Sequence, residues 1–170
     1  MRVRLALGIS LLATGLLAGA FGYGAANLVP TFDAVPQDMR FAFHAELMKI
    51  NGITVQGTMV VSFLSAAVLA FLAHGRARAM AAAASALTFA SFLITRFGNV
   101  PINGRIKRWA VEGPEPDTAE LLGRWELFND ARTISAVAAF ALLCLLALRS
   151  SGERAQSGRA SSELTQSGTA

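Results

Sequence analysis

The amino-acid sequence predicts an all-α fold, namely a membrane-embedded antiparallel four-helix bundle with a partly helical outer cap. Of the 170 residues, 54% are hydrophobic and only 15% are charged, whereas an average soluble domain has about 25% charged residues. The hydrophobic residues also gather into long uncharged runs, rather than alternating with a solvated face every few residues. So few charged residues cannot cover the surface of a soluble protein. We therefore expect the bilayer to cover most of the surface of this chain.

The uncharged runs cover residues 5–29, 53–73, 79–95 and 133–148. A helix of about 20 residues crosses a hydrocarbon core about 30 Å thick. The first two runs are long enough, and the last two extend past flanking arginines, whose aliphatic stems can lie along apolar surface. The predicted membrane helices therefore lie near residues 5–29, 53–74, 78–98 and 118–149.

The first run has an alternative interpretation as a secretory signal peptide, because two arginines precede it and residues 24–26 are small. The apolar core of a signal peptide usually has about 7–15 residues, which is much shorter than this run. We therefore favour a retained helix.

The two outer connections are long and show helical patterns of their own. One helix is predicted to begin at Pro36 and to end near Gly52, and another to run from Pro101 to Gly113. Asp117 and the glutamate three residues later have the spacing of a capping box, which predicts the start of the last helix.

Arginine placement predicts the topology of a multi-pass protein of the cell membrane. Arginines precede the first run, fill the short turn between the second and third, and follow the fourth. Basic residues near helix ends mark the cytoplasmic side, so we expect both termini in the cytoplasm. Residues 1–149 form the predicted transmembrane domain. Residues 150–170, rich in Ser, Gly, Gln and Arg, form a tail predicted to be disordered.

Charge and ligand chemistry narrow the expected partners to the lipid bilayer and a lipophilic small molecule. The net charge of +4 comes without a basic cluster interleaved with aromatic residues, so we expect no nucleic acid. We also expect no metal and no other cofactor. His44 and His74 lie at opposite membrane boundaries, and Cys144 stands alone in an apolar run. The sequence specifies no oligomeric state.

Most chemically capable side chains fall near the outer cap. Helical spacing gives three polar faces there: Trp125, Asn129 and Arg132; Arg96 and Asn99; and Arg40, His44, Leu47 and Asn51. An unpaired arginine within a membrane helix is costly, so we expect Arg132 to point into the bundle. The convergence of these faces predicts a polar site at one membrane boundary.

Several of these residues also have a purely structural interpretation. Trp109 and Trp125 are of a type that anchors helices at the membrane interface. Asn99 could cap a helix before Pro101. His44 could be a neutral residue that only donates and accepts hydrogen bonds.

Two motifs resemble those of a known family. The segment Asn99-Val-Pro-Ile-Asn103 is followed, after an acidic loop that contains proline, by Trp125-x-x-x-Asn129-x-x-Arg132. These motifs and the four-helix hydropathy over residues 1–149 resemble the anthrone oxygenase-like (noranthrone monooxygenase-like) membrane family. The resemblance implies a cofactor-independent oxygenase that converts an anthrone to an anthraquinone.

The resemblance also implies a set of site residues, namely Asn99, Asn103, Trp125, Asn129 and Arg132, to which we add Trp109 as an aromatic wall. An anthrone enolate reacts directly with O₂, so the protein must remove a proton and stabilise an oxyanion. Amide and guanidinium groups such as Arg132 suit the second task, and His44 or Glu46 suits the first. The alternative is a non-enzymatic protein whose polar cap binds a lipid or a protein partner. An apolar cavity beside Asn103, Asn129 and Arg132 would favour the oxygenase, and a solidly packed cap the alternative.

Overall fold

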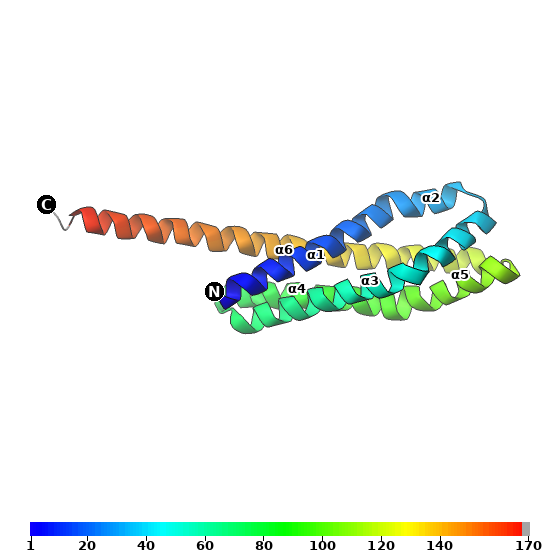
Figure 1. Ribbon diagram of the computed structural model, residues 1–170, viewed down its shortest axis with the longest axis horizontal. Helices are drawn as coiled ribbons and strands as arrows, with labels where there is room; N and C mark the ends of the chain where they lie inside the picture. Colours follow the sequence, from blue (N-terminus) through cyan, green and yellow to red (C-terminus); the bar gives the residue numbers. More distant parts are fainter. Residues whose placement is uncertain (168–170) are drawn as a thin grey trace.

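The computed structural model describes the backbone of residues 1–167 and the side chains of residues 1–149. The described chain is almost entirely helical and contains no strand. Helices long and apolar enough to cross a membrane span Arg2–Ala34, Gln37–Leu72, Gly75–Glu112 and Thr118–Arg149. They lie side by side in an antiparallel bundle (Figure 1). The predicted all-α four-helix fold is therefore confirmed.

The spans are built from eight successive segments. These are α1 (Arg2–Tyr23), the π-helical η1 (Gly24–Leu28), α2 (Val29–Ala34), α3 (Gln37–Leu72), α4 (Gly75–Ile94), the π-helical η2 (Thr95–Asn99), α5 (Val100–Glu112) and α6 (Thr118–Ser167). The N-terminus and the α3–α4 turn lie at one end of the bundle, and α2 and α5 lie at the other (Figure 1). We call the end with α2 and α5 the cap end.

Each π-helical segment directly precedes a Val-Pro pair, Val29-Pro30 or Val100-Pro101. Proline has no N–H to donate to the carbonyl four residues earlier, and its ring crowds that carbonyl. A single wider turn accommodates the proline without ending the helix. The two membrane helices therefore continue into the cap without a break.

The predicted end of a helix near Gly52 is wrong, because α3 continues without a break to Leu72. No proline lies near Gly52, so every neighbouring residue has a backbone N–H that can continue the helix. The Gly52 carbonyl also accepts a hydrogen bond from Gln56 Nε2 at 2.9 Å. The predicted end at Gly113 is confirmed, since this residue has a φ of 90° that favours glycine.

The last helix begins at Thr118, as the Asp117 signal predicts. The Asp117 carboxylate, however, accepts hydrogen bonds from Arg105 at 3.0 and 3.1 Å. Thr118 Oγ1 instead accepts from the backbone N–H of Glu115 at 2.9 Å. Asp117 therefore ties α6 to α5.

The helix α6 continues to Ser167. The prediction that residues 150–170 are disordered stays a prediction, because residues 168–170 and all side chains beyond 149 lie outside the described residues.

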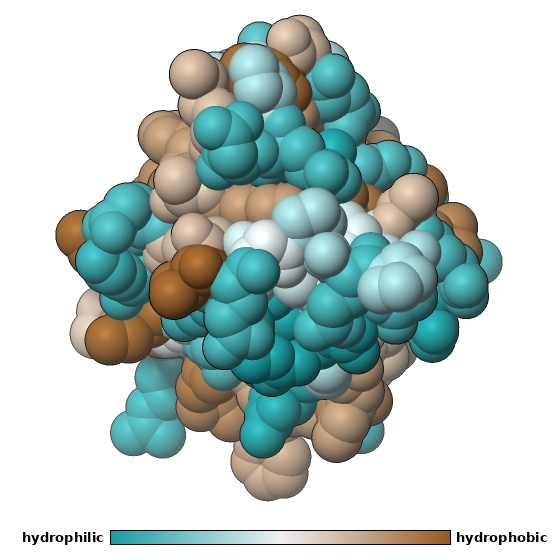
Figure 2. Space-filling view, turned by 90° about the vertical axis from the view of Figure 1, so that its right-hand side faces the viewer, coloured by the Kyte–Doolittle hydropathy of each residue, from teal (hydrophilic) through white to brown (hydrophobic). Residues whose placement is uncertain are grey.

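Two kinds of core hold the bundle together. The half away from the cap packs small residues such as Ala81, Ala84 and Ala139 around leucines, so that helices approach closely. The cap end packs large aromatic residues, among them Phe41 and Trp109. Seen from the cap end, the surface is largely hydrophilic, with apolar residues at parts of its rim (Figure 2). Apolar side chains along the membrane spans are widely exposed, as a bilayer-facing surface requires.

Candidate functional site

A cavity of about 270 Å³ lies where the membrane helices enter the cap. All four spans contribute to its wall. The α1–η1–α2 span supplies Phe21 and Phe32, α3 supplies His44, the η2–α5 span supplies Asn103, and α6 supplies Trp125, Asn129 and Arg132. The wall is thus mainly apolar, with a few polar groups that converge from different helices, as in small-molecule sites.

The His44 imidazole is held between two aromatic rings. It stacks on Phe32 with a centroid separation of 5.2 Å and an interplanar angle of 19°. It meets the edge of Trp125 at 4.9 Å and 66°. Only 1% of His44 is exposed. Packing therefore fixes the ring plane, and hydrogen bonding decides which nitrogen carries the proton.

Asn103 sets the tautomer of His44. Trp125 Nε1 donates to Asn103 Oδ1 at 2.7 Å, and His44 Nε2 lies 3.2 Å from the same oxygen. Because an indole N–H only donates, its partner must be the amide oxygen, which only accepts. The hydrogen of neutral His44 therefore sits on Nε2, and the lone pair sits on Nδ1. Nδ1 is buried and has no hydrogen-bond partner within the described part of the chain.

Arg132 and Asn129 supply hydrogen-bond donors to the same cavity. Arg132 Nε and one terminal nitrogen donate to Asn129 Oδ1 at 3.2 and 2.6 Å. This pairing turns the Asn129 amide so that Nδ2 is a donor, and among the described residues it has no partner. The Arg132 guanidinium also lies 4.4 Å from the centroid of Phe21, a favourable cation–π distance. Arg132 thus points into the bundle, as its position in a membrane helix predicts.

An ion-pair cluster centred on a buried arginine supports the wall that carries His44. Arg40, only 7% exposed, pairs with Asp33 next to the α2–α3 turn and with Glu126 of α6, the latter at 2.9 Å. Its guanidinium also lies 5.8 Å from the centroid of Phe32. These bonds hold α2 against α3 and α6, and so keep Phe32 on the face of His44.

The structure places the remaining predicted residues outside the cavity wall. Asn99 is fully buried within a continuous helix, where its Nδ2 donates to the Trp125 carbonyl at 3.0 Å, so its interpretation as a helix cap is wrong. Trp109 packs on Phe41 with centroids 5.5 Å apart. Glu46 is exposed and pairs with Lys49.

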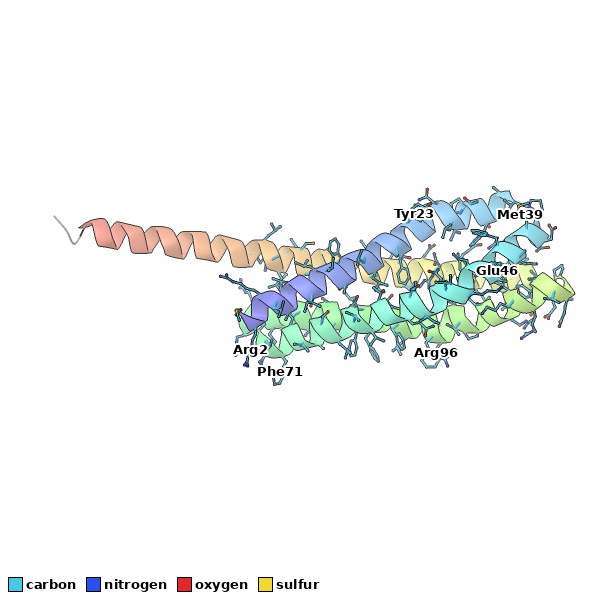
Figure 3. The ribbon with its side chains drawn as sticks, viewed as in Figure 1. Arg2, Tyr23, Met39, Glu46, Phe71 and Arg96 are labelled. Carbon is cyan, nitrogen blue, oxygen red and sulfur yellow. The ribbon has the colours of Figure 1, made fainter. Side chains whose placement is uncertain are left out.

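Asn99 therefore holds the backbone of Trp125 through a hydrogen bond, and Trp109 belongs to the core of the cap. Glu46, labelled on α3 in Figure 3, is exposed to the surroundings of the bundle. Arg96, also labelled there, is exposed at the edge of the bundle. His44 is therefore the candidate base that the cavity contains.

Sequence reasoning missed Phe21 and Phe32, which form aromatic parts of the wall. Both sit in apolar surroundings that are typical of membrane helices, and no polar spacing marks them. Leu47 and Asn51 were identified with the His44 face, and they do line the cavity.

The described residues contain no group of three or more His, Cys, Asp or Glu side chains that could hold a metal ion together. The polar side chains that line the cavity instead include one imidazole, one guanidinium, four amides and two hydroxyls, namely His44, Arg132, Asn51, Gln56, Asn103, Asn129, Tyr23 and Thr95. This set can accept one proton and donate several hydrogen bonds to an oxyanion.

Comparison with known proteins and protein families identifies the family of this chain. No curated protein and no solved structure matches the chain. The family model described as anthrone oxygenase matches residues 39–142, which is more than half of the chain. The matched segment contains His44, Asn103, Trp125 and Arg132, whereas Phe21 lies before it. The chain belongs to the anthrone oxygenase family.

Proposed function

We propose that this membrane protein is a cofactor-independent oxygenase that converts a lipophilic, anthrone-like aromatic ketone to a quinone. The observation that carries the proposal is the cavity itself. Its wall contains His44, whose Nδ1 has no hydrogen-bond partner among the described residues, together with Asn129, Arg132 and aromatic side chains. Membership in the anthrone oxygenase family supports this choice of substrate class.

Proton removal is the first step. The methylene carbon of an anthrone is acidic because its anion is delocalised onto the ketone oxygen. The lone pair on His44 Nδ1 takes one methylene proton, and the Arg132 guanidinium and Asn129 Nδ2 donate to the oxygen that becomes negative. Fixed donors of this kind stabilise a developing oxyanion without having to reorganise.

Oxygen then reacts with the enolate. The enolate carbon gives its electrons to O₂, a C–O bond forms, and the peroxide anion takes the proton back from the His44 imidazolium. Loss of the second methylene proton with cleavage of the O–O bond releases water and leaves a carbonyl. In total, a CH₂ group and O₂ become a C=O group and H₂O. The substrate supplies all four electrons.

The alternative, a non-enzymatic protein that binds a lipid or partner through a solidly packed cap, has less support. The cavity of about 270 Å³ lies beside Asn103, Asn129 and Arg132, where a packed cap would leave no such space. Its volume is slightly below the range of about 300 to 1,000 Å³ that is usual for small-molecule sites. A flat three-ring compound suits it better than a two-chain lipid.

The decisive experiment is oxidation of anthrone under ¹⁸O₂ by the purified protein in lipid nanodiscs. We expect one ¹⁸O atom in the quinone and the other in water, with one O₂ consumed for each product. Treatment with a metal chelator should leave the rate unchanged. Loss of activity on chelation would overturn the cofactor-independent route, and absence of turnover would favour the binding protein.

We also propose that both termini lie in the cytoplasm, because arginines flank the bundle end opposite the cap. Reporter proteins fused after Ala170 or inserted at Gly75 in the α3–α4 turn should both report the cytoplasmic side. A reporter within the loop at Pro114 should report the opposite side. An outside signal from either of the first two would reverse the topology.

A further inference from the structure

Two glycines, which have no side chain, lie on the side wall of the cavity between η1 and α3. Gly24 at the start of η1 and Gly52 of α3 both line the cavity. A Cβ atom added to either glycine would meet no heavy atom of the described chain within 4 Å. Both positions are therefore open rather than packed against a neighbouring helix, and α1 and α2 lean away from α3 in this region (Figure 1).

The outer surface of the two spans that form this wall carries exposed apolar side chains. Tyr23, which also lines the cavity, is 63% exposed, and Ile50 and Ile53, on the face of α3 turned away from the cavity, are 73% and 79% exposed. Tyr23 is labelled where α1 gives way to η1 in Figure 3. Large apolar residues gathered on a membrane span face lipid rather than water. Because this wall lies between two membrane spans, Arg2–Ala34 and Gln37–Leu72, its outer side borders the bilayer.

The cap end of the cavity, by contrast, is closed. Arg40 joins α2, α3 and α6 through its pairs with Asp33 and Glu126. Phe32 and Phe41 are only 3% and 1% exposed beneath that end. A ligand that arrived from water at this end would have to break these ion pairs, whereas a ligand dissolved in lipid meets two glycines.

We propose that the cavity opens sideways into the bilayer between η1 and α3, and that Gly24 and Gly52 set the size of the compound that can pass. This inference rests on the proposed function for the identity of the substrate, a flat multi-ring ketone that partitions into lipid. The oxyanion donors Asn129 and Arg132 lie on α6. The ketone end of the compound would thus enter the site first.

Tryptophan fluorescence tests the opening without any need for turnover. The chain contains two tryptophans, so a Trp109→Phe background leaves Trp125 in the cavity wall as the single probe. We expect lipids brominated in the upper acyl chain to quench Trp125 in nanodiscs, and Gly52→Leu to reduce that quenching. Gly24→Leu should act in the same way. Gly57→Leu is the matched control, because Gly57 is exposed on α3, also has open space, and lies outside the cavity wall.

Equal quenching in the Gly52→Leu and Gly57→Leu proteins would overturn the lateral opening. Strong quenching by aqueous iodide instead of brominated lipid would overturn it as well. In the anthrone assay, Gly52→Leu should lower kcat/KM by about tenfold, the effect of a small steric change in an apolar pocket, and Gly57→Leu should not. If the quenching depends on Gly52 but no anthrone is oxidised, the opening stands and the oxygenase proposal fails. If anthrone is oxidised equally by every variant and quenching does not change, the oxygenase stands and the opening fails.

Discussion

Replacement of His44 by alanine is expected to lower the rate of anthrone oxidation by about 10²- to 10⁴-fold, the usual contribution of a positioned general base. His44 Nδ1 carries the lone pair of the imidazole, because Asn103 Oδ1 accepts from both Trp125 and His44 Nε2. The measurement is kcat for quinone formation in nanodiscs. The wild-type rate should also fall toward acidic pH, because a protonated imidazole has no lone pair to accept the substrate proton.

His74→Ala is the matched control for this prediction, because His74 is exposed at the opposite end of α3. It should oxidise anthrone at the wild-type rate. Added imidazole should partly restore the His44→Ala protein, since the substitution leaves a space of the right shape. Unchanged kcat in His44→Ala, with helical content preserved by circular dichroism, would remove His44 from the mechanism.

Replacement of Arg132 by alanine is expected to lower kcat by about 10²- to 10³-fold, the typical loss for one oxyanion donor. Arg132 holds Asn129 through two hydrogen bonds, so its removal also frees the Asn129 amide to turn. Most of the loss should appear in kcat rather than KM, because the negative charge develops only after proton removal. Lysine should restore part of the rate, since it keeps the charge but not the planar fork.

Arg124→Ala provides the comparison on the same helix. Arg124 is exposed and lies outside the cavity wall, so its loss should leave kcat unchanged. A similar loss in both arginine variants would point to a general effect of positive charge on membrane insertion. Wild-type kcat in Arg132→Ala would exclude Arg132 as an oxyanion donor.

The sequence predicts the membrane helices well because the bilayer imposes a simple requirement on them. Any segment that crosses it must be helical, long and apolar, so the run at residues 5–29 and its three counterparts can be recognised locally. The helix boundaries at Gly113 and Thr118 also follow from local chemistry, a positive φ in one case and a helix-start signal in the other. Gly52 misled the prediction, because glycine does not break a helix whose ends are held by packing.

The candidate site was partly predictable for a similar reason. The spacing of Trp125, Asn129 and Arg132 places them on one face of a helix whatever the rest of the fold does. Trp109 has the same residue type as Trp125 and comparable surroundings in the sequence, yet it packs into the cap core against Phe41. Residue type and spacing describe a helix face, and they do not say which neighbouring helix covers it.

The sequence by itself determined that this chain is a four-helix membrane protein with polar residues concentrated at one boundary. Only the tertiary structure decided that these residues surround a cavity and that the lone pair of His44 sits on Nδ1. His44 and Trp125 reach the same oxygen of Asn103 from positions 59 and 22 residues away. Phe21 and Phe32 join the wall only because α1, η1 and α2 pack beside α6 and α3. A hydrogen-bond pattern between distant segments depends on how whole helices pack, and helix packing depends on side chains of every span at once.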